Sequence, residues 1–501
     1  MISTPSFSKP NLRVVYKYIK ANTKWLPYFV ILAGIVLRIN VFTDNRSLIL
    51  DEANLALNIH SKGYLSLLSA LDYEQFAPPG YLWLLKGSTT FFGYSEYGFR
   101  IVALLAGIVS LLLLYHSNRV FAANTVAWYS LALFAAGDIF LYYGTAVKQY
   151  STDILITIAL IIAGLCADVI NPSSPKRFYL GWMLAGFSIY FSMPAVFILA
   201  GIGLSFIYTI WCSKNYSRLW PLLGICGVWL GMFGAYYFLM LNAQIHSPYL
   251  QDFHQRFFSI LVPLSKDDWL HNGNLWGDLL LQLGGNTTLA IVFHLTLLAT
   301  GTIYLLYKHT SKGIVLLLPI LLLHIASGLQ MYTLLPRVSL FIMPVALIIM
   351  TAGLSTLWQL KYKTIRIALL AIMLVSVYNA AYVRYFSQPL LHEEFKDGMR
   401  LVQKNGINGK HFHVNGLIEN VFMYYTNIHP NKDEWASLKD AHIAPIWGNY
   451  DSLAQTFTRD AVIYAWYPDD LLKRDNDAYT KYCKVDTNYI HGIKLYICTK
   501  K

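Results

Sequence analysis

Apolar runs of about 17 to 25 residues, the length that an α-helix needs to cross a hydrocarbon layer about 30 Å thick, recur along most of the chain. Hydrophobic residues make up 56% of the sequence and charged residues 13%, and the mean hydropathy is +0.43, far from the balance of a soluble globular protein. The sequence therefore predicts a polytopic membrane domain that is all α-helical. The clear runs are residues 26–42, 98–115, 121–141, 150–170, 219–241, 287–307, 314–331, 338–358 and 365–383.

Two further segments leave the number of crossings open. Residues 178–211 are long enough for two short spans broken near Pro194, whereas residues 79–93 are short and contain Lys86, which favours a helix at the membrane interface. If residues 178–211 form two spans and residues 79–93 do not cross, the chain has about 11 spans. The loops on the side of the N-terminus then carry basic but no acidic residues. The positive-inside rule makes that side cytoplasmic. In the alternative topology 79–93 crosses and 178–211 crosses once, and both topologies place the segment after the first span outside.

The composition changes abruptly after residue 383. Charged residues return at ordinary density, and no further spanning run appears. We therefore expect a transmembrane domain at 1–383, with external loops at 43–97 and 242–286, and an extracytoplasmic α/β domain at 384–501. The elements expected in this last domain are a helix at 391–404, a strand at 411–415, a helix at 417–426, a strand at 460–466 and a closing hairpin.

Two adjacent carboxylates, Asp51 and Glu52, begin an amphipathic segment of the first external loop. Adjacent residues of a helix point in different directions, so one of them can face a substrate while the other binds a neighbouring group. The alternative is that both only enrich the N-terminus of a helix in acid, as is common. Taken alone, the pair leaves both interpretations open.

Several motifs follow one another in an order that resembles a known enzyme family. They are the pair Asp51-Glu52, "APPGYLWLLK" at 77–86, "GYSEYGFRIVALLAG" at 93–107, "LYYGTAVKQYSTD" at 141–153 and "PRVSLFIMP" at 336–344. This order is similar to that of the polyprenol-dependent glycosyltransferases of the GT-C fold, above all the branch of the protein O-mannosyltransferases and lipid A aminoarabinose transferases. The sequence departs from the family at Ala77, where a His is usual, at Gly80, where a Leu is usual, and at Lys148-Gln149, where many members carry an Arg pair or Arg-Thr.

The resemblance implies an enzyme that moves a sugar from a polyprenyl phosphate to an extracytoplasmic acceptor and inverts the anomeric carbon. Asp51 is then the general base, and Glu52 is a catalytic residue that supports the base or orients the acceptor. Arg100, Lys148 and Arg337 each fall at the outer end of a span, where they would bind the donor phosphate. The alternative for each of these bases is that it reaches the lipid headgroups without any substrate.

Four more residues are expected to support this site. Pro78 and Pro79 are the proline pair of the family's second motif. Tyr150 and Asp153 follow Lys148 and lie about one helical turn apart, so that Asp153 could orient the cation. An ordinary polar residue at the end of a span is an equal interpretation of Asp153.

The expected partners are a lipid-linked sugar donor, a glycan, lipid or protein acceptor, and the plasma (inner) membrane, with no nucleic acid. We expect no cofactor and no metal, although Asp51 and Glu52 offer oxygen ligands that suit a divalent ion. His411 and His413 alternate as on one face of a strand, which favours a polar strand face over a metal site. Two other functions are a transporter or flippase of a lipid-linked sugar, which should carry ionisable residues near mid-membrane, and a non-catalytic assembly subunit.

Two of the five cysteines, Cys483 and Cys498, flank a segment that reads as a hairpin turning at His491-Gly492. Outside the cytoplasm they could form a disulfide across the ends of the hairpin. Two free buried thiols are the alternative.

Overall fold

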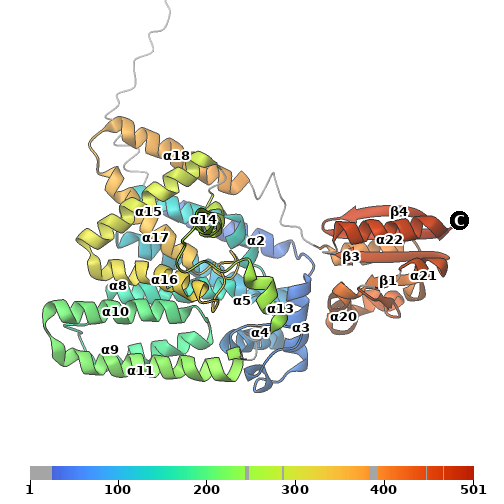
Figure 1. Ribbon diagram of the computed structural model, residues 1–501, viewed down its shortest axis with the longest axis horizontal. Helices are drawn as coiled ribbons and strands as arrows, with labels where there is room; N and C mark the ends of the chain where they lie inside the picture. The colour runs from blue at the N-terminus through green and yellow to red at the C-terminus, as the bar shows by residue number, and fades with distance from the viewer. Residues whose placement is uncertain are drawn as a thin grey trace, which may run out of the picture.

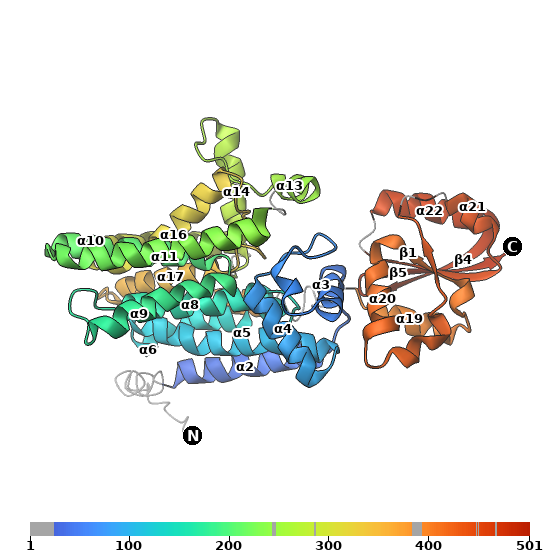
Figure 2. The same cartoon turned by 90° about the horizontal axis from the view of Figure 1, so that it is seen from below.

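The computed structural model describes residues 25–242, 247–284, 287–382, 393–446, 448, 450–465 and 468–501. These residues form a large helical part and a smaller part built on a β-sheet, which lie next to each other (Figure 1 and Figure 2). The basic N-terminal segment and the predicted domain boundary at residue 383 fall outside the described residues.

The long apolar runs of the sequence are helices in the structure. Seven helical stretches of the described residues are long and apolar enough to cross a membrane, and two shorter apolar helices accompany them. The seven are α2 (Leu26–Thr43), α5 (Glu96–Arg119), α10 (Ala195–Ser213), α11 (Leu219–Tyr236) with the short turns at its two ends, α15 (Thr288–Lys308), α16 (Thr310–Gly328) and α18 (Lys363–Tyr382). The shorter two are α8 (Tyr150–Cys166) and α17 (Ile342–Trp358). The chain is thus an integral membrane protein, as predicted, whereas the total of about 11 spans and the side of each loop stay predictions.

Two of the predicted apolar segments are interrupted, each at a residue that disfavours a helix. Residues 121–141 divide at Gly137 into α6 (Asn124–Ala136) and α7 (Asp138–Tyr143). Residues 178–211 divide into α9 (Pro175–Ala185), which a short 3-10 helix extends, and α10, which begins directly after Pro194. The predicted break near Pro194 is confirmed, and the break at Gly137 is a feature that the sequence analysis missed.

Arg38 stabilises the break at Gly137. Its side chain is fully buried in α2 and donates hydrogen bonds to the carbonyl oxygens of Phe134 (3.0 Å) and Ala135 (3.3 Å). These carbonyls belong to the last turn of α6, where no following helical turn supplies amide donors. A cation at this end of α6 also interacts favourably with the negative end of the helix dipole. Arg38 thereby helps to fix the position of α7 and of the loop after it, which carries Lys148.

The first external loop folds into α3 (Leu50–Ser61), a single 3-10 turn and α4 (Pro79–Phe92). The 14 residues of α4 are too few to cross a membrane of ordinary thickness. One face of α4 exposes Trp83 and Phe91, while Lys86 turns inward and donates to the carbonyl oxygen of Ile59 (2.8 Å). This geometry fits the interfacial helix predicted for residues 79–93. The second external loop contains α13 (Pro248–Gln255) and α14 (Lys266–Leu281), whose Trp269 is exposed as a membrane anchor would be.

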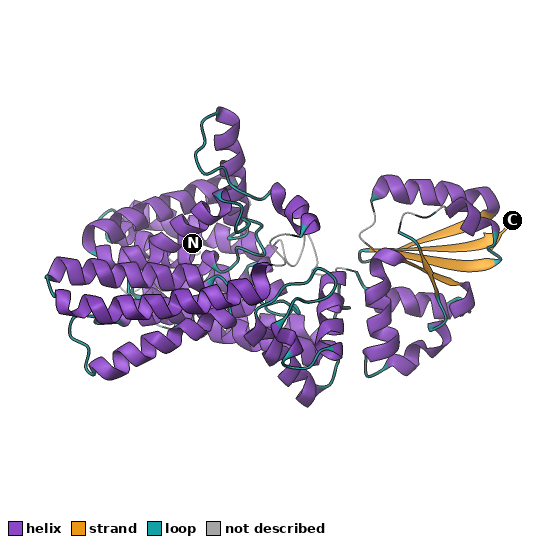
Figure 3. Cartoon of the chain, turned by 60° about the horizontal axis from the view of Figure 1, so that its bottom comes forward, coloured by secondary structure: helices purple, strands orange, loops and turns teal. Residues whose placement is uncertain are grey.

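The C-terminal part is a five-stranded mixed sheet with helices on both sides (Figure 3), which confirms the predicted α/β class. The strand order is β2-β1-β3-β5-β4; β1 pairs in parallel with β2 and β3, and the other pairs are antiparallel. The sequence pattern did not predict β2, α21 or α22. The elements are α19 (Phe395–Lys404), β1 (Phe412–Asn415), α20 (Glu419–Met423), β2 (His442–Ala444), α21 (Tyr450–Gln455), β3 (Arg459–Ala465), α22 (Asp469–Tyr482), β4 (Cys483–Ile490) and β5 (Ile493–Lys500).

The sheet-containing part docks on the start of α5 and on the chain just before α3. Glu96, the first residue of α5, accepts hydrogen bonds from Lys396 (2.8 Å), Tyr425 (3.1 Å) and the ring of His429 (2.9 Å). The backbone N–H of Leu48 donates to the Tyr425 hydroxyl at 2.8 Å. These contacts hold the segment that enters α3, and therefore the position of Asp51.

The predicted hairpin is present, but the predicted disulfide is not. β4 and β5 are joined through His491 and Gly492, which both have positive φ values, 32° and 82°, as a tight two-residue turn of this kind requires. In this register Cys498 faces Val485, and Cys483 faces Lys500, so the two cysteines are diagonal rather than opposite. Diagonal Cα atoms on paired strands lie about 7 to 8 Å apart, farther than a disulfide normally allows. Both are buried free thiols, which is the alternative left open above.

Every cysteine of the purified chain should therefore react with an alkylating agent after unfolding without reductant. Mass spectrometry of the alkylated protein is expected to show five modified thiols, as many as the sequence contains. A species that carries only three modifications, with Cys483 and Cys498 unmodified, would contradict the free-thiol assignment.

Candidate active site

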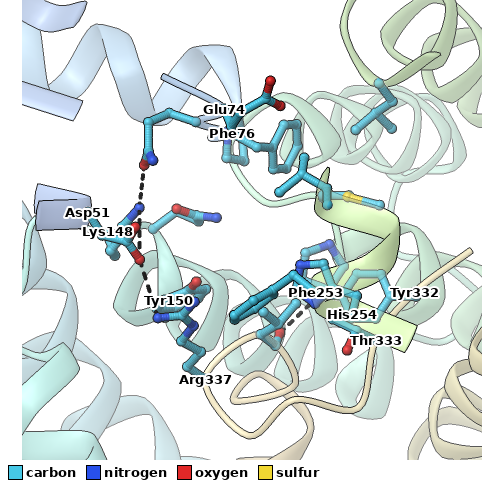
Figure 4. Close-up of a pocket in the computed structure, with 18 of the residues that line it drawn as sticks. Asp51, Glu74, Phe76, Lys148, Tyr150, Phe253, His254, Tyr332, Thr333 and Arg337 are labelled. Carbon is cyan, nitrogen blue, oxygen red and sulfur yellow. Dashed lines mark hydrogen bonds and ion pairs between the residues drawn. The ribbon is translucent and has the colours of Figure 1, made fainter. Parts of the chain in front are cut away.

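A cavity of about 350 Å³ opens beside the N-terminal end of α3, in the size range of pockets that bind small molecules. Its wall is assembled from both external loops, the loop before α8, the start of α10 and the loop between α16 and α17 (Figure 4). Segments far apart in the sequence thus contribute to one site. The lining residues are Leu50, Asp51, Asn54, Tyr73, Glu74, Gln75, Phe76, Pro78, Lys148, Gln149, Tyr150, Asp153, Met193, Pro194, Leu241, Leu250, Gln251, Phe253, His254, Phe258, Gln330, Met331, Tyr332, Thr333, Arg337 and Val338.

Asp51 faces this cavity together with two bases. Its Oδ2 atom lies 3.3 Å from a terminal nitrogen of Arg337 and 3.9 Å from Nζ of Lys148 (Figure 4). The side chains of Asp51 and Arg337 keep about a third of their surface exposed, at 34% and 33%, whereas Lys148 is 11% exposed. A carboxylate and two cations therefore share one accessible hollow, as the sequence analysis predicted for these three residues.

Neighbouring groups hold the two bases in place. Nζ of Lys148 donates to Oε1 of Gln75 at 2.7 Å, and the guanidinium of Arg337 lies over the ring of Phe253, 5.9 Å from its centre. An aromatic face attracts a cation and restricts its position. Gln75 and Phe253 were not singled out from the sequence, because a glutamine and a phenylalanine in external loops carry no signal of their own.

The charges of this cluster shift the protonation equilibria. Lys148 lowers the pKa of Asp51 below its ordinary value; burial opposes this shift, and Arg337 adds to it. Burial lowers the pKa of Lys148, while the charge of Asp51 counteracts that effect. Asp51 is consequently ionised at neutral pH and can accept a proton.

Glu52 lies on the other side of α3 and is completely buried. Arg46 binds both of its carboxylate oxygens at 3.0 and 3.1 Å, and Arg100 binds Oε2 at 2.8 Å. The backbone N–H of Val147 donates to Oε1 at 2.8 Å. Burial alone would raise the pKa of Glu52, but Arg100 and Arg46 lower it to about 2. Glu52 thus links α3, α5 and the residue that precedes Lys148.

These contacts correct two of the predicted roles. Glu52 does not orient the acceptor and takes no direct part in catalysis, because two guanidinium groups and backbone amides occupy its oxygens and it does not line the cavity. Of the two roles expected for it, only support of the neighbouring site agrees with these contacts. Arg100 does not bind a donor phosphate, because its side chain is 3% exposed and donates to Glu52 and to the carbonyl oxygens of Arg46 and Ser47. Arg46 was not predicted as part of the site, because its separation of six residues from Glu52 gave no sign of the ion pair.

Three of the four residues that were expected to support the site line the cavity. Pro78 lines the cavity and precedes α4, and Pro79 is its buried first residue, a position where a missing N–H costs nothing. Tyr150 and Asp153 both line the cavity. Among the described residues, however, no ion pair joins Asp153 to a base, and the Oδ1 atom of Asp153 has no hydrogen-bond partner. The expectation that Asp153 orients Lys148 is therefore wrong.

Comparisons with known proteins agree with the predicted resemblance. Residues 77–237 match the family model described as dolichyl-phosphate-mannose-protein mannosyltransferase. Among solved structures, the chain is similar to ArnT from Cupriavidus metallidurans bound to undecaprenyl phosphate, with a TM-score of 0.54 and 12% identity over 94% of this chain and 97% of that one. The apo state of the same protein gives a TM-score of 0.54 and 12% identity, over 95% and 98%.

The apo oligosaccharyltransferase of Archaeoglobus fulgidus is more distant, with a TM-score of 0.43 and 12% identity over 93% of this chain and 73% of that one. No curated protein sequence matches the chain. The likeness to ArnT confirms the GT-C fold, and the family model confirms the prediction of a glycosyltransferase. None of the comparisons supports the transporter alternative.

Proposed function

We propose that this protein is an inverting glycosyltransferase that takes a sugar from a polyprenyl phosphate and transfers it to an acceptor outside the cytoplasm. The observation that carries the proposal is the cluster of Asp51, Lys148 and Arg337 in one accessible cavity. Such a cluster combines a proton acceptor with two fixed cations for an anion. A base and a phosphate site are the two parts that this transfer needs.

Lys148 and Arg337 bind the phosphate of the donor in this proposal. Both nitrogens lie within 4 Å of Asp51 Oδ2, so an anion placed beside that carboxylate can contact both cations. Their charge stabilises the polyprenyl phosphate as it leaves, because its negative charge increases when the bond to the sugar breaks. ArnT bound to undecaprenyl phosphate supports a lipid-linked donor for this fold.

Asp51 accepts the proton of the acceptor. The acceptor oxygen or nitrogen forms a bond to the anomeric carbon, its proton passes to Asp51, and the bond from that carbon to the phosphate oxygen breaks with its electron pair on the phosphate. A single displacement of this kind inverts the anomeric centre. Gln75 and Tyr150 complete the wall around the reacting groups.

Binding of the donor would also activate the base. In the protein without substrate, Lys148 and Arg337 keep the pKa of Asp51 below its ordinary value. A bound phosphate pairs with the same cations, which weakens their effect on Asp51 and raises its pKa again. A carboxylate with a higher pKa is a stronger base, so proton transfer becomes easier once the donor is in place.

The remaining features of the proposal concern location and acceptor. The active site and the sheet-containing part lie outside the plasma membrane and the N-terminus lies in the cytoplasm, as the distribution of basic loops indicates. The acceptor is lipid A, a polysaccharide, a cell-wall glycan or a protein hydroxyl. No metal takes part, because Lys148 and Arg337 already supply positive charge beside Asp51 and would repel a divalent cation there.

Binding of undecaprenyl phosphate tests the phosphate site directly. Lys148→Met and Arg337→Met should each weaken binding of this lipid to the purified full chain by about tenfold to a hundredfold, because a hydrogen bond to a charged group contributes about 1.5–3 kcal/mol. Lys62→Met serves as the matched control, since Lys62 forms a surface ion pair with Asp72 in the same external loop. Binding that is unchanged in both Lys148→Met and Arg337→Met would contradict the proposed donor site.

A further inference from the structure

A second polar cluster, without a cation, lies in the wall of the same cavity. It is formed by Gln149 and Asp153, four residues apart at the start of α8. The backbone N–H of Asp153 donates to the carbonyl oxygen of Gln149 at 2.9 Å, so the two residues stack on one face of the helix. Neither residue takes part in the proposed binding of the donor phosphate or in the proposed proton transfer to Asp51.

Both side chains carry a buried polar atom that nothing in the described part of the chain satisfies. Gln149 is 8% exposed and Asp153 is 3% exposed. Oε1 of Gln149 and Oδ1 of Asp153 have no hydrogen-bond partner among the described residues. Because leaving a buried polar group unpaired is costly, such atoms in a cavity wall indicate a ligand that pairs with them.

Three buried tyrosines lie in the neighbourhood of the Asp153 carboxyl. Tyr81, Tyr236 and Tyr332 lie close enough to interact electrostatically with it. The hydroxyls of Tyr81 and Tyr236 are also buried and lack a partner among the described residues. Tyr81 and Tyr236 do not line the cavity, and the hydroxyl of Tyr332, which does, donates to the carbonyl oxygen of Val338 at 2.9 Å. The donor that the cluster offers to a ligand is therefore the amide of Gln149, which donates as well as accepts.

The position of the cluster relative to Lys148 suggests which part of a ligand it meets. Lys148 directly precedes Gln149, and one turn of an α-helix, which rises about 5.4 Å, separates Gln149 from Asp153. A sugar joined to a phosphate at Lys148 would extend along this turn, with its ring hydroxyls beside Gln149 and Asp153.

We propose that Gln149 and Asp153 form the subsite that recognises the donor sugar, and that this sugar is neutral with adjacent free hydroxyl groups. Each sugar hydroxyl both donates and accepts, which matches the acceptors of Gln149 and Asp153 and the amide donor of Gln149. Asp153 is buried and forms no ion pair with a base among the described residues, which favours its uncharged carboxyl form. A sugar ammonium or carboxylate beside it would lose water without gaining a counter-charge, whereas a neutral sugar would not. The inference rests on the proposed function and specifies the class of its donor.

The test measures how much the sugar adds to lipid binding. Purified full chain in lipid nanodiscs is titrated with undecaprenyl phosphate alone and with the same lipid carrying mannose, glucose, galactose, 4-amino-4-deoxyarabinose or galacturonic acid. At least one neutral sugar should tighten binding about tenfold or more over the bare lipid, because several hydrogen bonds form at once. Asp153→Asn and Gln149→Met should remove most of this gain and leave affinity for the bare lipid unchanged.

A control variant and a stability measurement separate recognition from folding. Asp168→Asn changes a carboxylate just beyond the other end of α8, where Oδ1 accepts from the backbone of Ile170 and Asn171, and should keep the full gain. Asp153→Asn should unfold at about the same temperature as the wild type, because no hydrogen bond from the described residues to Oδ1 is lost.

The outcomes distinguish failure of the inference from failure of the proposed function. If the bare lipid binds but Asp153→Asn and Gln149→Met keep the full sugar-dependent gain, the subsite assignment is wrong. If the amino sugar or the uronic acid binds most tightly, the neutral-sugar class is wrong. If neither the bare lipid nor any loaded lipid binds the wild type, the donor itself is wrong and the inference falls with the function.

Discussion

Asp51→Asn should lower the rate of sugar transfer by about a hundredfold to ten-thousandfold, the contribution typical of a general base. Asparagine keeps the shape of the side chain but cannot accept the proton of the acceptor. Its effect should appear in kcat, since the base acts only as the acceptor attacks. Transfer is measured with the purified chain, a polyprenyl-phosphate sugar that the wild type accepts and its acceptor.

The same variant should bind undecaprenyl phosphate at least as tightly as the wild type. The carboxylate of Asp51 occupies the two cations when no donor is present, at 3.3 and 3.9 Å, and its charge would repel a phosphate. Asp72→Asn is the matched control, because Asp72 is 61% exposed in the same loop and pairs only with Lys62 among the ion pairs of the described residues. Full activity in Asp51→Asn would overturn the assignment of the base.

Glu52→Gln is expected to destabilise the folded protein by roughly 3–5 kcal/mol, the range found when one partner of a buried ion pair is removed. Two guanidinium groups, those of Arg46 and Arg100, would remain buried without their counter-charge. The backbone of Val147 would also be held less firmly, so Lys148 would be misplaced. The unfolding temperature and the transfer activity of Glu52→Gln should therefore both fall. Asp51→Asn should lose activity but keep the unfolding temperature of the wild type.

The stability that Glu52 contributes should depend on pH in a known direction. The folded protein lowers the pKa of Glu52 to about 2, below the value of about 4.3 in an unfolded chain. The ionised carboxylate therefore stabilises the fold above about pH 4.3, and this contribution is lost as the pH falls towards 2. The gap in unfolding temperature between wild type and Glu52→Gln should stay constant near neutral pH and narrow in acid.

A triple variant serves as the counterpart of Glu52→Gln. Arg46→Met, Glu52→Leu and Arg100→Met together remove every charge of the buried cluster, and a buried ion cluster replaced as a whole by apolar residues often costs little stability. The triple variant should unfold at a higher temperature than Glu52→Gln. If Glu52→Gln alone is as stable as the wild type, the buried cluster does not organise the site.

Local features of the sequence were enough to predict most of the fold. The long helices, the interfacial α4, the break at Pro194 and the hairpin at His491-Gly492 all follow from the composition of short segments. Hydropathy, proline and turn residues act within a few positions of themselves, so neighbouring residues determine their effect. The break at Gly137 was missed because the glycine lies inside a continuous apolar run. The hydrogen bonds that satisfy the last carbonyl groups of α6 come from Arg38 of another helix, which the local sequence does not reveal.

The candidate site could be predicted only in part. Asp51, Lys148 and Arg337 were selected by type and position, and the structure brings them together. Glu52 and Arg100 met the same criteria, yet they bind each other away from the cavity. The motif spacing could not separate the two groups, because it states how far residues lie apart along the chain and not which way each side chain points.

The sequence by itself determined that this chain is a helical membrane protein with a C-terminal α/β part, and that an acid and several bases gather near one end of its spans. Only the tertiary structure decided which acid meets which base. Asp51 and Arg337 are 286 residues apart, and whether their side chains meet depends on how the helices between them pack. Adjacent residues of one helix face different surroundings, so that packing leaves Asp51 open to the cavity and buries Glu52 among guanidinium groups.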